Sequence, residues 1–191
     1  MKRIILIIYM LTAAYILKSQ DIVFTSQKEV VESLIYLNEL RHSKELVKQE
    51  TGIEVPRVCE EELTLNETLC KLAKLRVLEM IRNDRTSHKS IYDKRGYNEC
   101  VGYNTSTTIK NHIIQYIIDK GVSSLGHRKM LILDYGNKVI GIASAISPEG
   151  KHFSCILTQS GRLKNVVLTK KGYNKCNPFI KNVKIMTIYS S

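Results

Sequence analysis

Apolar residues recur at every third or fourth position in three segments of the chain, which is the spacing of a helix that buries one face. The first helix is expected over residues 26–49 and starts at a capping box, Ser26-x-x-Glu29. The second is expected to start at a similar box, Thr64-x-x-Glu67, and the third to cover residues 106–120, with Ser106 or Thr107 as its cap. The apolar positions that these helices would bury are Val30, Val31, Leu34, Leu37, Leu40, Leu65, Leu69, Leu72, Ala73, Met80, Ile109, Ile113, Tyr116 and Ile117.

The clearest strand pattern lies near the end of the chain. Residues 139–146 and 152–159 are rich in β-branched and apolar residues, and a short connection with Pro148 and Gly150 joins them. Two such runs predict an antiparallel hairpin. A further short strand is expected over residues 97–103, while residues 183–189 fit either a last strand or a surface segment. Helices that alternate with these strands predict an α+β domain in which helices pack on an antiparallel sheet.

Both ends of the chain differ from this central region. Met1-Lys2-Arg3 is followed by an uncharged apolar run to Leu17, which is typical of a signal peptide over residues 1–20. The alternative is an uncleaved membrane anchor, because Leu17-Lys18-Ser19-Gln20 lacks the usual small-x-small cleavage pattern. We therefore expect one domain over residues 26–161 and a basic C-terminal extension over residues 162–191.

The chain has a formal net charge of +11, and loss of Lys2, Arg3 and Lys18 with the leader would leave +8. A basic protein favours anionic partners, such as an anionic membrane surface, an acidic lipid or a glycan. No nucleic acid is expected as a partner, because the predicted leader places the protein outside the cell. Localisation is accordingly expected to be secreted and extracellular.

The cysteines are expected to meet an oxidising compartment, where two disulfides and one free thiol would form from five residues. We expect Cys100 and Cys155, each on a predicted strand, to pair with each other or with the two early cysteines. There is no Cys-x-x-Cys, which excludes a zinc ribbon. The disulfide candidates are Cys59, Cys70, Cys100, Cys155 and Cys176.

Candidate chemistry gathers around the end of the third predicted helix. Asp119 falls in its last turn, where the helix dipole disfavours a carboxylate, so a nearby cation or proton donor is expected. His127 follows after a short loop with Gly121 and Gly126. Earlier in the chain, Ser-His88 and Asn-Glu99 provide a second imidazole and a second acid, whereas His42, His112 and His152 have no motif around them and are interpreted as surface or packing residues.

The order and surroundings of these residues resemble the CAP superfamily of cysteine-rich secretory proteins, antigen 5 and pathogenesis-related 1 proteins, whose domain is also called SCP. The resemblance covers roughly residues 30–161. The matching pieces are Leu37-Asn38-x-x-Arg41, Leu65-Asn66-x-x-Leu69-x-x-x-Ala73, Ser87-His88, Asn98-Glu99, Asp119-Lys120-Gly121-Val122, Gly126-His127-Arg128 and Val139-Ile140-Gly141-Ile142.

The resemblance implies an α-β-α sandwich with a small antiparallel sheet between helical layers and a central cleft. It also implies that His88, Glu99, Asp119 and His127 form a tetrad whose two imidazoles hold a divalent metal, with zinc the expected ion. The two carboxylates would orient the imidazoles or a bound water. Asp119 stands where many relatives have the longer Glu, so a water-bridged contact is expected in place of a direct one. Tyr116 stands where they often have Trp.

Three functions remain open at this stage. The first is a secreted protein that binds an extracellular lipid or sterol, a glycan, or a host or partner protein, with a cleft that can hold a divalent ion. The second is a metal-assisted secreted hydrolase or protease in which Glu99 or Asp119 is the catalytic base. The third is a structural interaction module with a vestigial cleft. Because no oxyanion donor can be identified in the sequence, we favour binding over catalysis.

Overall fold

The computed structural model describes residues 22–90, 96–105, 108–133 and 136–160. The predicted signal peptide, the C-terminal extension with its candidate strand and Cys176 lie outside the described residues. The described elements, in order, are β1 (Val23–Phe24), α2 (Gln27–His42), α3 (Lys44–Thr51), β2 (Thr64–Leu65), α4 (Glu67–Arg82), β3 (Asn98–Asn104), α5 (Ile109–Ile118), α6 (Gly126–Arg128), the π-helical turn η1 (Lys129–Leu133), β4 (Val139–Ile146) and β5 (His152–Gln159).

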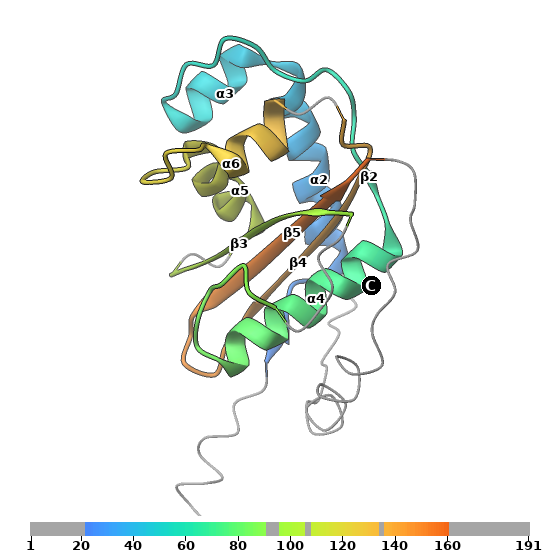
Figure 1. Cartoon of the computed structure of the whole chain (residues 1–191), viewed down its shortest axis with the longest axis vertical. Coiled ribbons are helices and arrows are strands. Elements are labelled where there is room, and N and C mark those ends of the chain that lie inside the picture. Colours follow the sequence, from blue (N-terminus) through green and yellow to red (C-terminus); the bar gives the residue numbers. More distant parts are fainter. Residues whose placement is uncertain (1–21, 91–95, 106–107, 134–135, 161–191) are drawn as a thin grey trace, which may run out of the picture.

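The sheet is built around the predicted hairpin, which is confirmed. Strands β4 and β5 pair antiparallel from Val139 opposite Gln159 to Ile146 opposite His152. Strand β3 pairs antiparallel with the other edge of β5, and β1 pairs antiparallel with β4. The two-residue strand β2 adds a short parallel pairing at the start of β4. The strand order is therefore β1-β4-β5-β3 (Figure 1).

Helices cover both faces of this sheet. Helix α4 lies across one face, while α2, α3, α5 and α6 lie on the other (Figure 1). Alternate residues of the strands supply two separate cores. Phe153 and Leu157 pack in the core under α4 with Leu69 and Val77, whereas Ile156 packs in the second core. The predicted α+β sandwich is thereby confirmed.

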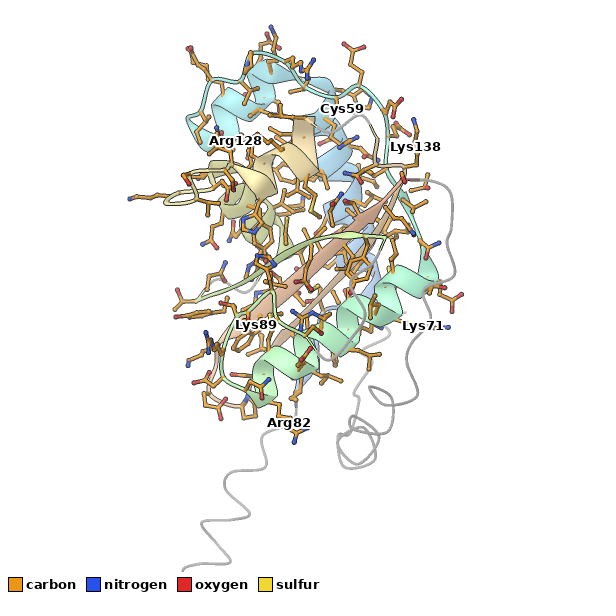
Figure 2. All side chains as sticks on the ribbon, viewed as in Figure 1. Cys59, Lys71, Arg82, Lys89, Arg128 and Lys138 are labelled. Carbon is orange, nitrogen blue, oxygen red and sulfur yellow. The ribbon has the colours of Figure 1, made fainter. Side chains whose placement is uncertain are left out.

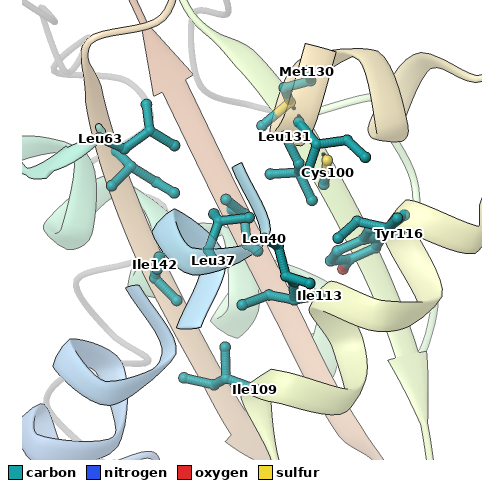
Figure 3. Packing of buried hydrophobic residues seen from close by; sticks show 14 of the residues in the cluster. Leu37, Leu40, Leu63, Cys100, Ile109, Ile113, Tyr116, Met130, Leu131 and Ile142 are labelled. Atoms are coloured by element: carbon teal, nitrogen blue, oxygen red, sulfur yellow. Dashed lines mark hydrogen bonds between the residues drawn. The ribbon is translucent and has the colours of Figure 1, made fainter. Parts of the chain in front are cut away.

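The core between the sheet and the helices α2 and α5 is made of aliphatic side chains. Leu37 and Leu40 of α2 meet Ile113 of α5 over Ile142 of β4 (Figure 3). All four are essentially inaccessible to solvent. Truncation of one such leucine to alanine typically costs about 2–5 kcal/mol.

Three details of the predicted helices are wrong. The first predicted helix is two helices, because Ser43 interrupts it and its hydroxyl caps α3 by accepting the N–H of Leu46. Thr64 lies in β2, and Asn66 caps α4 in place of the Thr64 box by accepting the N–H of Leu69. Helix α5 starts later than expected and is capped by Thr108, while the predicted caps Ser106 and Thr107 lie outside the described residues. In the last two cases a neighbouring side chain of the same capping class makes the contact.

The predicted pairing of Cys100 with Cys155 is also wrong. Cys100 lies opposite Ile156 and packs in the core under α5, whereas Cys155 lies opposite Val101 and packs under α4. The two thiols therefore point to opposite faces of the sheet. None of the described cysteines, Cys59, Cys70, Cys100 and Cys155, forms a disulfide.

Within the described part of the chain, no helix combines the length and the apolar character needed to cross a membrane. The labelled basic side chains lie on different sides of the domain and not in one patch: Lys71 and Arg82 at α4, Lys89 in the loop after α4, Arg128 at α6 and Lys138 at the start of β4 (Figure 2).

Candidate functional site

Two acid–imidazole pairs meet at the end of α5. The Nδ1 atom of His88, in the loop after α4, lies 3.1 Å from Oε1 of Glu99 on β3. The Nδ1 atom of His127, on α6, lies 2.8 Å from Oδ1 of Asp119, which ends α5. The centroids of the two imidazole rings are 5.8 Å apart. The structure therefore brings together all four members of the predicted tetrad.

Local backbone geometry places Asp119. It is the residue after α5, it adopts a left-handed conformation with φ of 52°, and its N–H still bonds the carbonyl of Gln115. This turn directs the carboxylate at the start of α6, where Oδ2 accepts the main-chain N–H groups of His127 at 3.1 Å and Arg128 at 3.4 Å. The expected water bridge is wrong, because the short side chain and the tight turn together bring α6 into direct contact.

Arg128 places a positive charge at the negative end of the α5 helix dipole. The guanidinium of Arg128 donates from Nε to the carbonyl of Ile117 and from Nη2 to that of Ile118, each at 2.7 Å. These are carbonyls of the last turn of α5, which have no partner inside the helix. Arg128 thus offsets the negative end of α5 beside the Asp119 carboxylate. The proton donor and the cation expected near Asp119 are both present.

Glu99 has a partner that the sequence reasoning missed. The Arg76 guanidinium reaches it through two contacts, Nε to Oε2 at 2.6 Å and Nη2 to Oε1 at 3.3 Å. Arg76 also bonds Glu79 and the carbonyl of Ser87, and both Arg76 and Glu99 are almost fully buried. Although burial opposes the charge, the hydrogen bond and charge of Glu99 raise the pKa of Arg76. The signal was available, because Arg76 falls on the apolar stripe of α4 between Ala73 and Met80.

Tyr116 forms the wall behind His127. Its ring centroid lies 5.2 Å from that of His127, and its hydroxyl is 2.7 Å from the Ser154 hydroxyl. Burial raises the pKa of Tyr116 well above its ordinary value, so the phenol stays neutral. Gly102 of β3 makes room for the ring, because a Cβ there would lie 3.0 Å from the Tyr116 hydroxyl.

The motif residues of α2 act away from the cleft. Asn38 bonds both the N–H and the carbonyl of Leu63. The fully buried Arg41 donates to the carbonyls of Glu61 and Leu131 and to the sulfur of Cys59. These contacts fasten the loop after α3 and the turn η1 to α2, and η1 lies directly after the helical turn that carries His127.

The tetrad opens into a cleft of about 840 Å³. His88 has 61% of its side chain exposed, whereas His127 has 18%. The cleft is lined by His88, Tyr97, Asn98, Glu99, Val122, Ser124, Gly126, His127, Lys129 and Met130. Cys100 lies beneath it, with its sulfur 3.4 Å from that of Met130.

The two imidazoles are the groups of the cleft that could hold a metal. An imidazole bound to zinc at about 2 Å places its ring centroid about 3 Å from the ion, so two rings that share one ion lie about 5–6 Å apart. The observed 5.8 Å falls in that range. Because each Nδ1 faces a carboxylate, each Nε2 is left with its lone pair for a metal. Within the described residues, no group of three or more His, Cys, Asp and Glu side chains has the arrangement of a metal site.

Comparison with known proteins places this geometry in context. The model of the CAP family, described as "Cysteine-rich secretory protein family", matches residues 34–157. Among solved structures, an outer surface protein from Borrelia burgdorferi is similar over 71% of this chain and 95% of its own, with 14% sequence identity and a TM-score of 0.49. No curated protein matches the sequence significantly.

Proposed function

Because this chain belongs to the cysteine-rich secretory protein family, CAP, we propose that it is a secreted protein that acts outside the cell by binding, with a divalent ion held between His88 and His127. Zinc is the ion of choice, because neutral imidazole nitrogens suit it. The observation that carries the proposal is the pair of acid–imidazole contacts. Each contact fixes one ring nitrogen as a donor to a carboxylate and so leaves the other nitrogen for a metal.

The same contacts favour binding over hydrolysis. A general base must accept a proton from a metal-bound water, so it needs a free lone pair in reach of that water. Glu99 already accepts two contacts from Arg76 and one from His88. Asp119 accepts three contacts, from the N–H and ring of His127 and from the N–H of Arg128. Both carboxylates are thus engaged in holding other groups in position.

Zinc titration of the folded protein by calorimetry tests the site. Wild-type protein should bind one zinc ion, and His127→Ala should weaken that binding at least tenfold, because one of the two protein ligands is lost. His42→Ala is the matched control, since His42 is an exposed histidine whose ring bonds the carbonyl of Asn38 on α2. Equal zinc affinity in all three proteins would reject the ion site and favour the structural module with a vestigial cleft.

Zinc should also raise the thermal midpoint. The free energy of unfolding should rise by RT ln(1 + [Zn]/Kd), which is about 2.7 kcal/mol when zinc is at a hundredfold excess over Kd. A broad panel of peptide and ester substrates separates the binder from the hydrolase. Turnover by the zinc-loaded protein that vanishes in Glu99→Gln, measured under conditions where that variant is still folded, would favour the enzyme.

Secretion is a separate part of the proposal. It rests on the basic start of the chain and the apolar run that follows it. Expression of the whole chain in a secreting host, followed by N-terminal sequencing of protein from the medium, should give a mature start near Asp21. Protein that stays with the membrane and keeps Met1 would favour the anchor.

A further inference from the structure

The negative charges of the cleft are held away from a ligand. The Glu99 side chain is 5% exposed and is paired with Arg76, while that of Asp119 is fully buried and is bonded by α6. Although Glu99 lines the cleft, a cationic ligand would therefore meet two carboxylates that already have partners. Among the described residues that line the cleft, the other polar groups are imidazole, hydroxyl and amide groups, together with one ammonium group.

That ammonium group belongs to Lys129, the first residue of η1. Its backbone is fixed, because its N–H bonds the carbonyl of Leu125 at 3.0 Å, and the residue lines the cleft together with His127. Lys129 is exposed and makes no ion pair with another described residue. In contrast to Lys138 and Lys151, which pair with Glu61 and Asp84, it keeps its charge available to a ligand.

A zinc ion at the two imidazoles would add to this charge. Both protein ligands are neutral, so the ion would keep its full double charge, and a four-coordinate ion would have two positions left for other donors. An anionic oxygen is a far better donor to such an ion than a neutral one. The cleft of about 840 Å³ is large enough for a ligand much bigger than a water molecule.

We propose that the cleft selects an oxyanion, a carboxylate or phosphate group of the bound molecule, which completes the coordination of the ion and is paired with Lys129. The inference rests on the proposed zinc site and names the chemistry of the ligand there. Lys129 acts as the specificity-determining residue, because it contacts the anion and not the metal.

The test uses acetate and methyl phosphate as anions and acetamide as the neutral analogue of acetate, titrated into zinc-loaded full-length protein by calorimetry. At least one anion should bind, and acetamide should bind much more weakly or not at all. Lys129→Gln should weaken binding of that anion about fivefold or more, because a charge-assisted contact is lost, and should leave zinc affinity unchanged. Lys120→Gln is the matched control, since Lys120 is an exposed lysine of the same loop that does not line the cleft.

Acetate and methyl phosphate distinguish a carboxylate ligand from a phosphate ligand. Preference for acetate identifies a carboxylate ligand, and preference for methyl phosphate identifies a phosphate ligand. Zinc binding without anion binding, acetamide binding as tight as acetate binding, or equal anion affinity in Lys129→Gln would overturn the inference and leave the proposed zinc site intact. Failure of the wild-type protein to bind zinc would overturn both the proposed zinc site and this inference.

Discussion

Asp119 holds His127 through two atoms at once, its Oδ1 lying 2.8 Å from the ring Nδ1 and its Oδ2 accepting the main-chain N–H at 3.1 Å. The first contact sets the tautomer of the ring, and the second sets the position of the backbone that carries it. A single carboxylate therefore fixes both the chemistry and the orientation of the more buried imidazole of the pair.

The first prediction concerns Asp119→Asn. The amide keeps the size of the side chain and tolerates the left-handed backbone, but it is a poorer acceptor for the ring N–H. Zinc binding should weaken about 10–100-fold, which is the usual effect of losing such a supporting carboxylate. Hydrogen exchange of the His127 amide should become faster even without zinc.

Asp84→Asn is the matched control, because Asp84 also has a positive φ, of 45°, and its exposed carboxylate pairs with Lys151. It should change neither zinc affinity nor the exchange of His127. If Asp119→Asn keeps wild-type zinc affinity and exchange, the carboxylate does not hold the imidazole.

A second prediction is that Glu99→Gln destabilises the fold. Loss of the carboxylate leaves the guanidinium of Arg76 buried with a weaker partner, which should lower the free energy of unfolding by about 3 kcal/mol. Urea denaturation of Glu99→Gln, Arg76→Met and the double variant measures the coupling of the pair. The exposed Glu67, paired with Lys71, is the control, and Glu67→Gln should change stability little. Additive losses in the double variant would show that the pair is uncoupled.

Much of the fold could be predicted from the sequence because it depends on local patterns. The β-branched and apolar runs over residues 139–146 and 152–159, with the short connection that holds Pro148 and Gly150, predict the hairpin, and the structure pairs them over their full length. Helix boundaries were less predictable. Asn66 is a cap that competes with Thr64 nearby, and the sequence alone does not decide between them.

The sequence predicts which residues form the site, but it does not predict the contacts between them. Motif order was enough to identify His88, Glu99, Asp119 and His127. The role of Arg76 depends on how α4 lies across β3, and the separation of Cys100 from Cys155 depends on strand register. Both are long-range relationships that no spacing along the chain encodes.

A third prediction follows from the contact between α4 and β4. A Cβ on Gly141 would lie 2.2 Å from the backbone carbonyl carbon of Leu69, and neither backbone can move without separating helix from sheet. Gly141→Ala should therefore cost about 3 kcal/mol or more, at the upper end of overpacking effects. Gly126→Ala is the control, since its new Cβ would meet nothing closer than the Ser124 hydroxyl at 3.5 Å. Comparison of the urea midpoints checks this, and equal midpoints would contradict the close approach.

The last prediction is a loss of stability in mild acid, caused by His112. This imidazole is buried on α5 with its ring centroid 4.8 Å from that of the buried His152. Burial, with the neighbouring charge of His152, lowers the pKa of His112 from 6.5 to about 3. Because the folded-state pKa lies below the unfolded one, the contribution is complete above pH 6.5 and is lost as the pH falls toward 3. Between pH 7 and pH 5 the free energy of unfolding should fall by about 2 kcal/mol through this residue.

His112→Phe should remove that part of the pH dependence, whereas His42→Gln, at an exposed histidine, should retain it. Urea denaturation at the two pH values measures the difference, and an equal fall in the wild-type and His112→Phe proteins would show that His112 is not the group responsible.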